Sequence, residues 1–312
     1  MRVYPGRRET LERLRCALEQ RLPTLTGAQG RQIRRQLRRR GFVQTRYELG
    51  VGVMDCWTGG RGAPVILIHG FGASSEWQWS SQMIALAAER RVIAPDLLYF
   101  GGSTSDLVNP GLEHQVNALA QLMDRLDIAQ ADLVGVSYGG FVAQSMVTRY
   151  PERVGRLTLV DSPGSIFEEA DYTHILDVFG ITQLDELLLP RDHAAMVRLM
   201  KLAWHAPPTL PRFLLADARR ALFTHQVAEK RALLDDLLSY MGQGHPLPPE
   251  FWSRTLLIWG AHDPIFPVSL AERVHRAWSG SRLVVIPDAS HAPQLERPNL
   301  VTSVLRRHLA AA

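Results

Sequence analysis

The chain has 312 residues, of which 46% are hydrophobic and 21% are charged. This is enough apolar material for a sizeable buried core, so a disordered chain is excluded. Its two cysteines, Cys16 and Cys56, are too few for a disulfide framework and stand at no metal-ligand spacing. We therefore expect a globular protein, compatible with a reducing compartment, without a metal or a cofactor.

The first forty residues differ in charge from the rest of the chain. They hold twelve arginines and three glutamates, a net charge of +9, and because the whole chain carries +4 the remaining residues carry −5. Leucines recur at helical spacing over residues 11–22, and the arginine-rich run 31–40 indicates a second, short helix. We expect residues 1–40 to form a basic helical extension that packs its leucines on the core. The alternative is a surface that contacts anionic membrane lipid or another polyanion.

Other partners and the location follow from what the chain lacks. No apolar stretch is long enough to span a membrane, and no apolar signal segment follows the first arginines. We expect a cytoplasmic protein whose membrane contact, if any, is peripheral. Because the basic charge is confined to the extension and no nucleic-acid-binding module accompanies it, we expect no nucleic-acid partner.

Strand and helix patterns alternate from residue 42 onward. The first half of this region predicts edge strands at 42–48 and 51–57, buried strands at 64–68 and 91–95, and helices at 80–90 and 112–126. The strand at 64–68 runs into His69-Gly-Phe-Gly72, and Asp96 follows the strand at 91–95. His69, directly at the strand end, is also a candidate catalytic histidine.

Ser137 stands where a strand turns into a helix. Apolar residues precede it in a run typical of a buried strand, and others follow it at helical spacing. A turn this tight strains the serine backbone and brings strand and helix close together, so small residues are needed two before and two after it. Gly135 and Gly139 meet that need, and Ser137 is the candidate nucleophile.

A serine hydroxyl becomes a good nucleophile when a histidine takes its proton and a carboxylate orients that histidine. The strand expected at 254–260 runs into Asp263, and the strand expected at 282–286 runs into the loop that carries His291. Asp161, at the end of a strand expected at 156–160, is a second candidate for the acid. Asp263 is preferred because of the Trp-Gly-Ala-His sequence before it.

Between residues 162 and 251 the strand patterns give way to leucine-rich helical patterns interrupted by prolines. The expected helices are 183–189, 192–204, 212–223 and 228–241. Five histidines of this stretch stand at no metal-ligand spacing and are interpreted as surface or packing residues: His174, His193, His205, His225 and His245.

The motifs, in this order, resemble the α/β-hydrolase superfamily over about residues 42–310. They are His69–Gly72, Ala94–Leu97, Gly135–Gly139, Trp259–Asp263 and Ser290–Pro298. Within the superfamily the chain is most similar to monoacylglycerol lipase-like esterases and their plant and bacterial relatives. The resemblance implies an α/β fold with a mostly parallel eight-stranded sheet and helices on both faces. The core would comprise residues 41–161 and 252–312, with a helical cap over 162–251.

The resemblance also implies the remaining parts of a site. The amides of Phe71 and Tyr138 would donate to an oxyanion. The resemblance makes His69 and Asp96 loop-ordering residues. Four aromatic residues are candidates for the substrate pocket, with core packing as the alternative for the two tryptophans: Trp77, Trp79, Tyr99 and Phe100.

The activity implied is hydrolysis of a carboxylic ester, with a lipid-like ester such as a monoacylglycerol favoured. Ser137 would attack, His291 would transfer the proton and Asp263 would orient His291. One alternative is hydrolysis of a carbon–carbon bond in a ring-cleavage product. Ala292 counts against it, because such hydrolases usually carry a tryptophan directly after the histidine. Another is a ligand-binding receptor with slow turnover. The sequence leaves the oligomeric state open.

Overall fold

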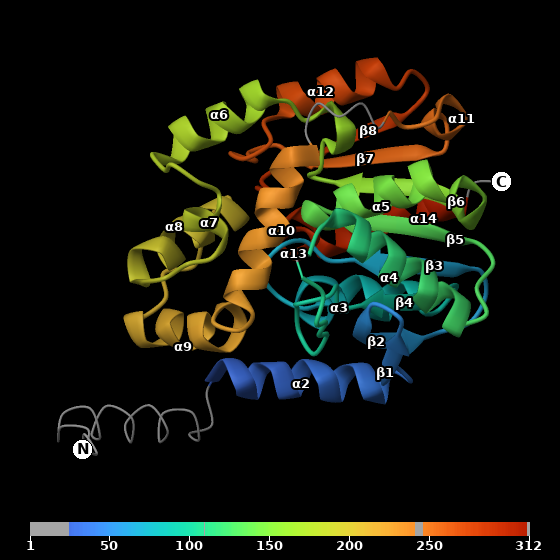
Figure 1. Cartoon of the computed structure of the whole chain (residues 1–312), viewed down its shortest axis with the longest axis horizontal. Coiled ribbons are helices and arrows are strands. Elements are labelled where there is room, and N and C mark those ends of the chain that lie inside the picture. The colour runs from blue at the N-terminus through green and yellow to red at the C-terminus, as the bar shows by residue number, and fades with distance from the viewer. Residues whose placement is uncertain (1–24, 109, 241–245, 311–312) are drawn as a thin grey trace.

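The computed structural model describes residues 25–108, 110–240 and 246–310 (Figure 1). Within them, eight strands form one sheet in the order β1-β2-β4-β3-β5-β6-β7-β8. Strand β1 pairs with β2, and β2 with β4, in antiparallel fashion, and the remaining neighbours are parallel. The strands are β1 (Val43–Leu49), β2 (Gly52–Gly59), β3 (Pro64–Ile68), β4 (Arg91–Pro95), β5 (Ala131–Val136), β6 (Val154–Val160), β7 (Thr255–Gly260) and β8 (Arg282–Ile286). The mostly parallel eight-stranded sheet is therefore confirmed.

Helices cover both faces of the sheet because its central strands are apolar on both sides. Successive side chains of a strand point to opposite faces, and in β3 Ile66 and Ile68 join one hydrophobic core while Val65 and Leu67 join the other. The first core includes α4 (Leu112–Arg125), α5 (Tyr138–Arg149) and α12 (Val268–Ala277). The second includes α3 (Ser75–Leu86) and α14 (Pro298–Leu309).

A helical insertion connects β6 to β7, and no strand of the described residues lies within it. Its helices are α6 (Glu169–Phe179), the short α7 (Asp185–Leu188), α8 (His193–Ala203), α9 (Arg212–Phe223), α10 (Val227–Tyr240) and the short α11 (Pro249–Trp252). Figure 1 shows α6 to α10 gathered at one side of the sheet. The sequence predicted four of these helices and missed α6. Only Ile175 of α6 is fully buried, so its apolar stripe is too narrow to identify from periodicity.

The basic N-terminal segment contributes a packed helix, α2 (Leu25–Arg39), which begins six residues before the predicted one. Leu37 is fully buried in the same core as Trp57 and Trp79. The Thr26 amide donates to Asp217 Oδ2 of α9 at 2.8 Å, and α2 also pairs with α3 through an ion pair of Arg34 Nη1 with Glu76 Oε1 at 3.1 Å. The leucine pattern at 11–22 lies outside the described residues.

Helix α3 begins at Ser75, whereas the sequence predicted a helix beginning at residue 80. The Ser75 amide and hydroxyl both bind Asp96 Oδ1, each at 2.8 Å, and Asp96 follows the neighbouring strand β4. This long-range contact fixes the helix start, and local propensity alone does not reveal it. The earlier start places Trp77 and Trp79 on the helix. Among the described residues, no helix combines the length and the apolar character needed to cross a membrane.

The burial of Leu37 predicts that α2 stabilises the fold. Leu37→Ala should lower the free energy of unfolding by about 2–5 kcal/mol, because it leaves a cavity in a closed core. Chemical denaturation would measure this loss. Leu25→Ala is the matched control, since Leu25 lies on the same helix and is 60% exposed. Equal, small effects of the two substitutions would show that α2 is not part of the core.

Candidate active site

Ser137 occupies a strained turn between β5 and α5. Its φ of 51° and ψ of −120° lie in the left-handed half of the backbone map, which non-glycine residues rarely adopt. A Cβ on Gly135 would lie 2.2 Å from the Gly139 carbonyl oxygen, and a Cβ on Gly139 would lie 2.4 Å from the Ile68 carbonyl oxygen. Only glycine fits at these two positions, for the steric reason that the sequence suggested.

The three predicted polar residues meet in a hydrogen-bonded chain. His291 Nε2 lies 2.9 Å from Ser137 Oγ, and His291 Nδ1 lies 2.8 Å from Asp263 Oδ2. They come from the loops that follow β5, β7 and β8, and parallel strands bring their carboxyl ends to one edge of the sheet. Asp263 and His291 are buried, so the chain of contacts is largely protected from water.

Asp263 is held so that one oxygen faces His291. Its other oxygen, Oδ1, accepts hydrogen bonds from the amides of Ile265 at 2.8 Å and Phe266 at 3.1 Å. These two amides fix the carboxylate orientation, and the carboxylate in turn fixes the imidazole. In such an arrangement Nδ1 carries the proton and Nε2 can accept one from the serine.

Asp161, the alternative acid, serves the backbone instead. It is fully buried at the end of β6, and its Oδ1 accepts the Gly260 amide at 2.8 Å. Burial, followed by the nearby charge of Asp263, raises the pKa of Asp161 well above its usual value. By binding the Gly260 amide, this carboxyl group supports the strand β7 that leads to Asp263. The structure therefore places Asp263, and not Asp161, against His291.

Two backbone amides beside Ser137 are available to a ligand. Across the described part of the chain, neither Phe71 N nor Tyr138 N donates a hydrogen bond to another protein atom. Tyr138 is the first residue of α5, where helix geometry provides no partner for its amide. The sequence analysis named both amides but not Gln78, which lies between Trp77 and Trp79. Its side chain binds both the Gly70 amide, at 2.8 Å, and the Gly70 carbonyl, at 3.3 Å, and so holds the turn that presents Phe71.

His69 and Asp96 tie loops together, as the sequence indicated. His69 Nε2 accepts the Leu97 amide at 2.9 Å, and Nδ1 lies 2.7 Å from the Gly70 carbonyl oxygen. Burial lowers the pKa of His69 to about 4, so its ring is neutral at physiological pH. Asp96, besides its bonds to Ser75, accepts the Gly102 amide at 3.3 Å.

An apolar cavity of about 30 Å³ lies against Ser137. Both the core and the helical insertion supply its walls. The lining residues besides Ser137 are Phe71, Tyr138, Phe141, Phe167, Ile175, Leu184, Leu188, Leu234, Leu237, Ile265 and Phe266. None of these side chains is charged, so the cavity suits an apolar group.

The four aromatic residues predicted for the pocket do not line this cavity. Trp79 is fully buried in the other core, because α3 begins early enough to turn it toward the sheet. The Phe100 ring packs edge-on against Phe71 at 5.0 Å between centroids and lies behind the cavity wall. Trp77 and Tyr99 line a second cavity, of about 270 Å³, between α2, α3 and α9. Core packing, the alternative for the two tryptophans in the sequence analysis, therefore describes Trp79. Phe100 also packs in a core, so its prediction as a pocket residue is wrong for this cavity.

The second cavity contains a buried lysine. Lys230 is 3% exposed, donates to the His225 carbonyl at 2.9 Å, and lies 5.1 Å from the Phe100 ring centre. Burial lowers the pKa of Lys230 to about 8. Glu76, Asp96 and Arg34 line the same cavity, so its charged groups are of both signs.

Comparison with known proteins decides the family. The family described as alpha/beta hydrolase fold matches residues 63–298, well over half of the chain. The chain belongs to the α/β-hydrolase family. It is 32% identical to a 2-hydroxymuconate semialdehyde hydrolase of Pseudomonas sp. (strain CF600), over 81% of this chain and 89% of that protein.

Other members of the family with different activities are comparably similar. The chain is 33% identical to the dihydrolipoyllysine-residue acetyltransferase component of an acetoin cleaving system of Pseudomonas putida, over 80% of this chain. That match spans 65% of the relative, less than two thirds of its length. Among solved structures, an esterase from Thermogutta terrifontis is 25% identical with a TM-score of 0.70, covering 86% of this chain and 98% of that one. The chain is therefore a hydrolase, and the proteins similar to it carry out several different reactions.

The geometry predicts that the two aspartates differ in effect. Asp263→Asn should slow fluorophosphonate labelling of Ser137 by about 10³-fold or more, because the asparagine favours the wrong imidazole tautomer. Asp161→Asn should stay within about tenfold of wild type, since the asparagine side chain keeps an oxygen that accepts the Gly260 amide. Labelling rates of purified proteins would measure both. A larger loss for Asp161→Asn would assign the acid to β6.

Proposed function

We propose that this α/β-hydrolase cleaves carboxylic esters through an acyl-enzyme. The observation that carries the proposal is the chain of hydrogen bonds from Ser137 through His291 to Asp263, with Ser137 in a strained turn. This combination of nucleophile, base and orienting carboxylate is what acyl transfer requires. The esterase among its structural neighbours supports the same chemistry.

The reaction would proceed in two halves. His291 Nε2 takes the Ser137 proton as Oγ attacks the carbonyl carbon, and the amides of Phe71 and Tyr138 stabilise the oxyanion. The carbon–oxygen bond to the alcohol then breaks, and His291 gives its proton to the leaving alcohol. Water, losing a proton to His291, attacks the acyl-enzyme in the same way and releases the acid and Ser137.

The cavity sets the acyl group that fits. A cavity needs about 10–15 Å³ to hold one water molecule. The cavity of about 30 Å³ at Ser137 therefore holds only a short apolar chain. Walls from α6, α7 and α10 close the space over Ser137, which is the role we propose for the insertion as a cap. A lipid-like ester requires these helices to move outward, whereas a short-chain ester does not.

Carbon–carbon hydrolysis is the second candidate. The 2-hydroxymuconate semialdehyde hydrolase that is 32% identical to this chain acts, by its name, on a semialdehyde that carries a carboxylate. Lys230 could bind such a group. Ala292 and the uncharged lining of the cavity at Ser137 favour the ester. Lys230 lies beyond the Phe71 and Phe100 rings, in the other cavity.

Ester turnover should depend on Ser137. Ser137→Ala should reduce hydrolysis of p-nitrophenyl esters by about 10⁴-fold or more while the thermal unfolding temperature stays near wild type, because the change removes the nucleophile and little volume. The wild-type kcat/KM should be highest for acetate and butyrate esters.

The same assay tests the alternatives. A higher kcat/KM for a carboxylated ring-cleavage product than for any ester would favour carbon–carbon hydrolysis. Labelling by a fluorophosphonate without turnover of either substrate class would indicate a slow ligand-binding receptor. Near wild-type activity of Ser137→Ala would contradict the serine mechanism altogether.

We further propose that the basic face of α2 contacts anionic membrane lipid. Arg31, Arg35 and Arg39 are exposed on this helix, and the described residues of α2 include no acidic side chain. Clustered arginines at a surface attract anionic lipid over a distance of about one Debye length. Such contact would hold the hydrolase at a membrane surface without a membrane-spanning segment.

Charge removal tests this contact. Arg35→Gln with Arg39→Gln should weaken sedimentation with phosphatidylserine vesicles by roughly tenfold or more at low salt, as each arginine contributes about 1 kcal/mol. Soluble-ester kinetics should not change. The matched control is Arg125→Gln with Arg276→Gln, two exposed arginines of other helices. Equal loss in both double variants would show a nonspecific effect of net charge.

A further inference from the structure

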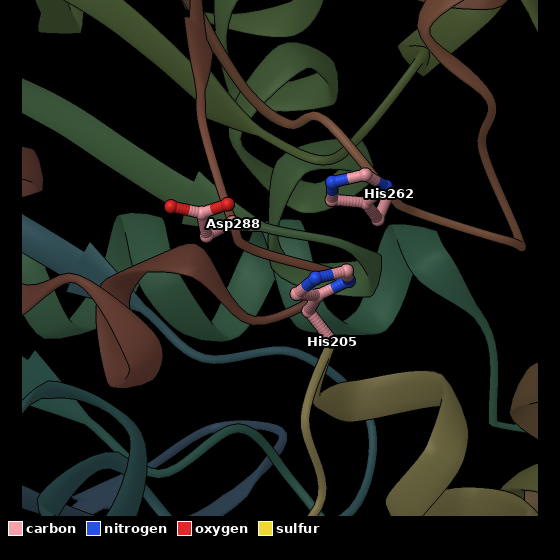
Figure 2. Close-up of side chains that lie close together, drawn as sticks. All are labelled: His205, His262 and Asp288. Atoms are coloured by element: carbon pink, nitrogen blue, oxygen red, sulfur yellow. The ribbon is translucent and has the colours of Figure 1, made fainter.

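Three side chains outside the catalytic constellation gather at one place on the surface (Figure 2). They are His205, His262 and Asp288, and all three are exposed. A ligand atom from each lies within 4.8 Å of the others. The sequence analysis interpreted His205 as a surface or packing residue, because it stands at no metal-ligand spacing. The three residues belong to segments far apart in the chain.

The backbone holds these segments together without any ion. The His262 amide donates to the Ala289 carbonyl at 2.9 Å. The Ser290 hydroxyl lies 2.7 Å from the Leu202 carbonyl oxygen and 3.2 Å from that of His262. Glu296 accepts the amides of His205, at 2.8 Å, and Ser290, at 2.6 Å. The three ligands therefore stand on a prearranged frame.

We propose that His205, His262 and Asp288 bind a divalent transition-metal ion of the Zn²⁺ type. Two imidazole nitrogens and one carboxylate oxygen form a ligand set that suits Zn²⁺, with further positions filled by water. Bonds of about 2.0–2.1 Å place ligand atoms about 3.3 Å apart in a tetrahedral site. The present separations, up to 4.8 Å, need only small side-chain movements to reach that spacing.

Two local contacts must adjust. The imidazoles of His205 and His262 are stacked, with centroids 3.9 Å apart and planes 18° apart. Both rings must turn so that their nitrogens face the ion, and because both are exposed this turn disturbs no core. Arg297 Nη2 pairs with Asp288 Oδ2 at 3.3 Å, and the other carboxylate oxygen is a separate ligand atom.

The position gives the ion a structural role. His205 belongs to the insertion, between α8 and α9, His262 directly precedes Asp263, and Asp288 lies three residues before His291. A bound ion would fasten the insertion to the two loops that carry the acid and the base of the candidate active site. An ion that binds the folded protein and not the unfolded chain would stabilise the folded protein.

Calorimetric titration of the full, untagged chain with Zn²⁺ tests the site. We expect one ion per chain and a rise in the thermal unfolding temperature. His205→Ala and Asp288→Asn should each weaken binding by at least about tenfold, and asparagine also tolerates the φ of 49° at position 288. The control His174→Ala, an exposed histidine of α6, should bind as wild type does.

The assay is independent of turnover, so failure here and failure of the proposed esterase function are distinguishable. Ser137→Ala should bind Zn²⁺ as tightly as wild type. No binding at millimolar Zn²⁺, or binding that neither His205→Ala nor Asp288→Asn weakens, would overturn the proposal and leave the two histidines as a stacked surface pair.

Discussion

The turn at Ser137 depends on backbone groups that approach one another more closely than a side chain would allow. Gly135 lies against the Gly139 carbonyl, and Gly139 lies against the carbonyl groups of Ile68 and His69. This packing draws the end of β5, the start of α5 and the loop after β3 into one compact unit. As a result, Ser137, Phe71 and Tyr138 come from different elements yet line one cavity. The strain at Ser137 persists because its neighbours fix the backbone on both sides.

Two buried carboxyl groups lie near this unit and perform different tasks. Asp263 uses both oxygens, one for a pair of amides and one for His291. Asp161 binds a backbone amide of β7 and has its pKa raised by burial and by Asp263. Burial and the nearby carboxylate both disfavour the charged form of Asp161. Through its bond to the β7 amide, Asp161 supports the strand from which Asp263 extends.

The helical insertion is attached to the core at the same place. Leu202, at the end of α8, accepts hydrogen bonds from the Ser290 hydroxyl and, at 3.4 Å, from the His291 amide. Glu296, on the short helix α13 (Pro293–Glu296), joins the segment after α8 to the loop of His291. The insertion is therefore hydrogen-bonded to the loop that carries His291. The insertion also contacts α2, which binds α9 and packs Leu37 in the same core as Trp57 and Trp79.

The sequence by itself determined the sheet strands, the order Ser137, Asp263, His291 and the need for glycine at 135 and 139, because these depend on short-range patterns and local sterics. Only the tertiary structure decided what depends on residues far apart in the chain. Asp96 fixes the start of α3, and that start removes Trp79 from the expected pocket. The weak apolar stripe of α6 gave no periodic signal, although Ile175 closes the cavity at Ser137. The sequence before Asp263 favoured it over Asp161, and the fold brings Asp263 against His291. The meeting of His205, His262 and Asp288 required the fold, since neither spacing nor composition encodes which loops face each other in space.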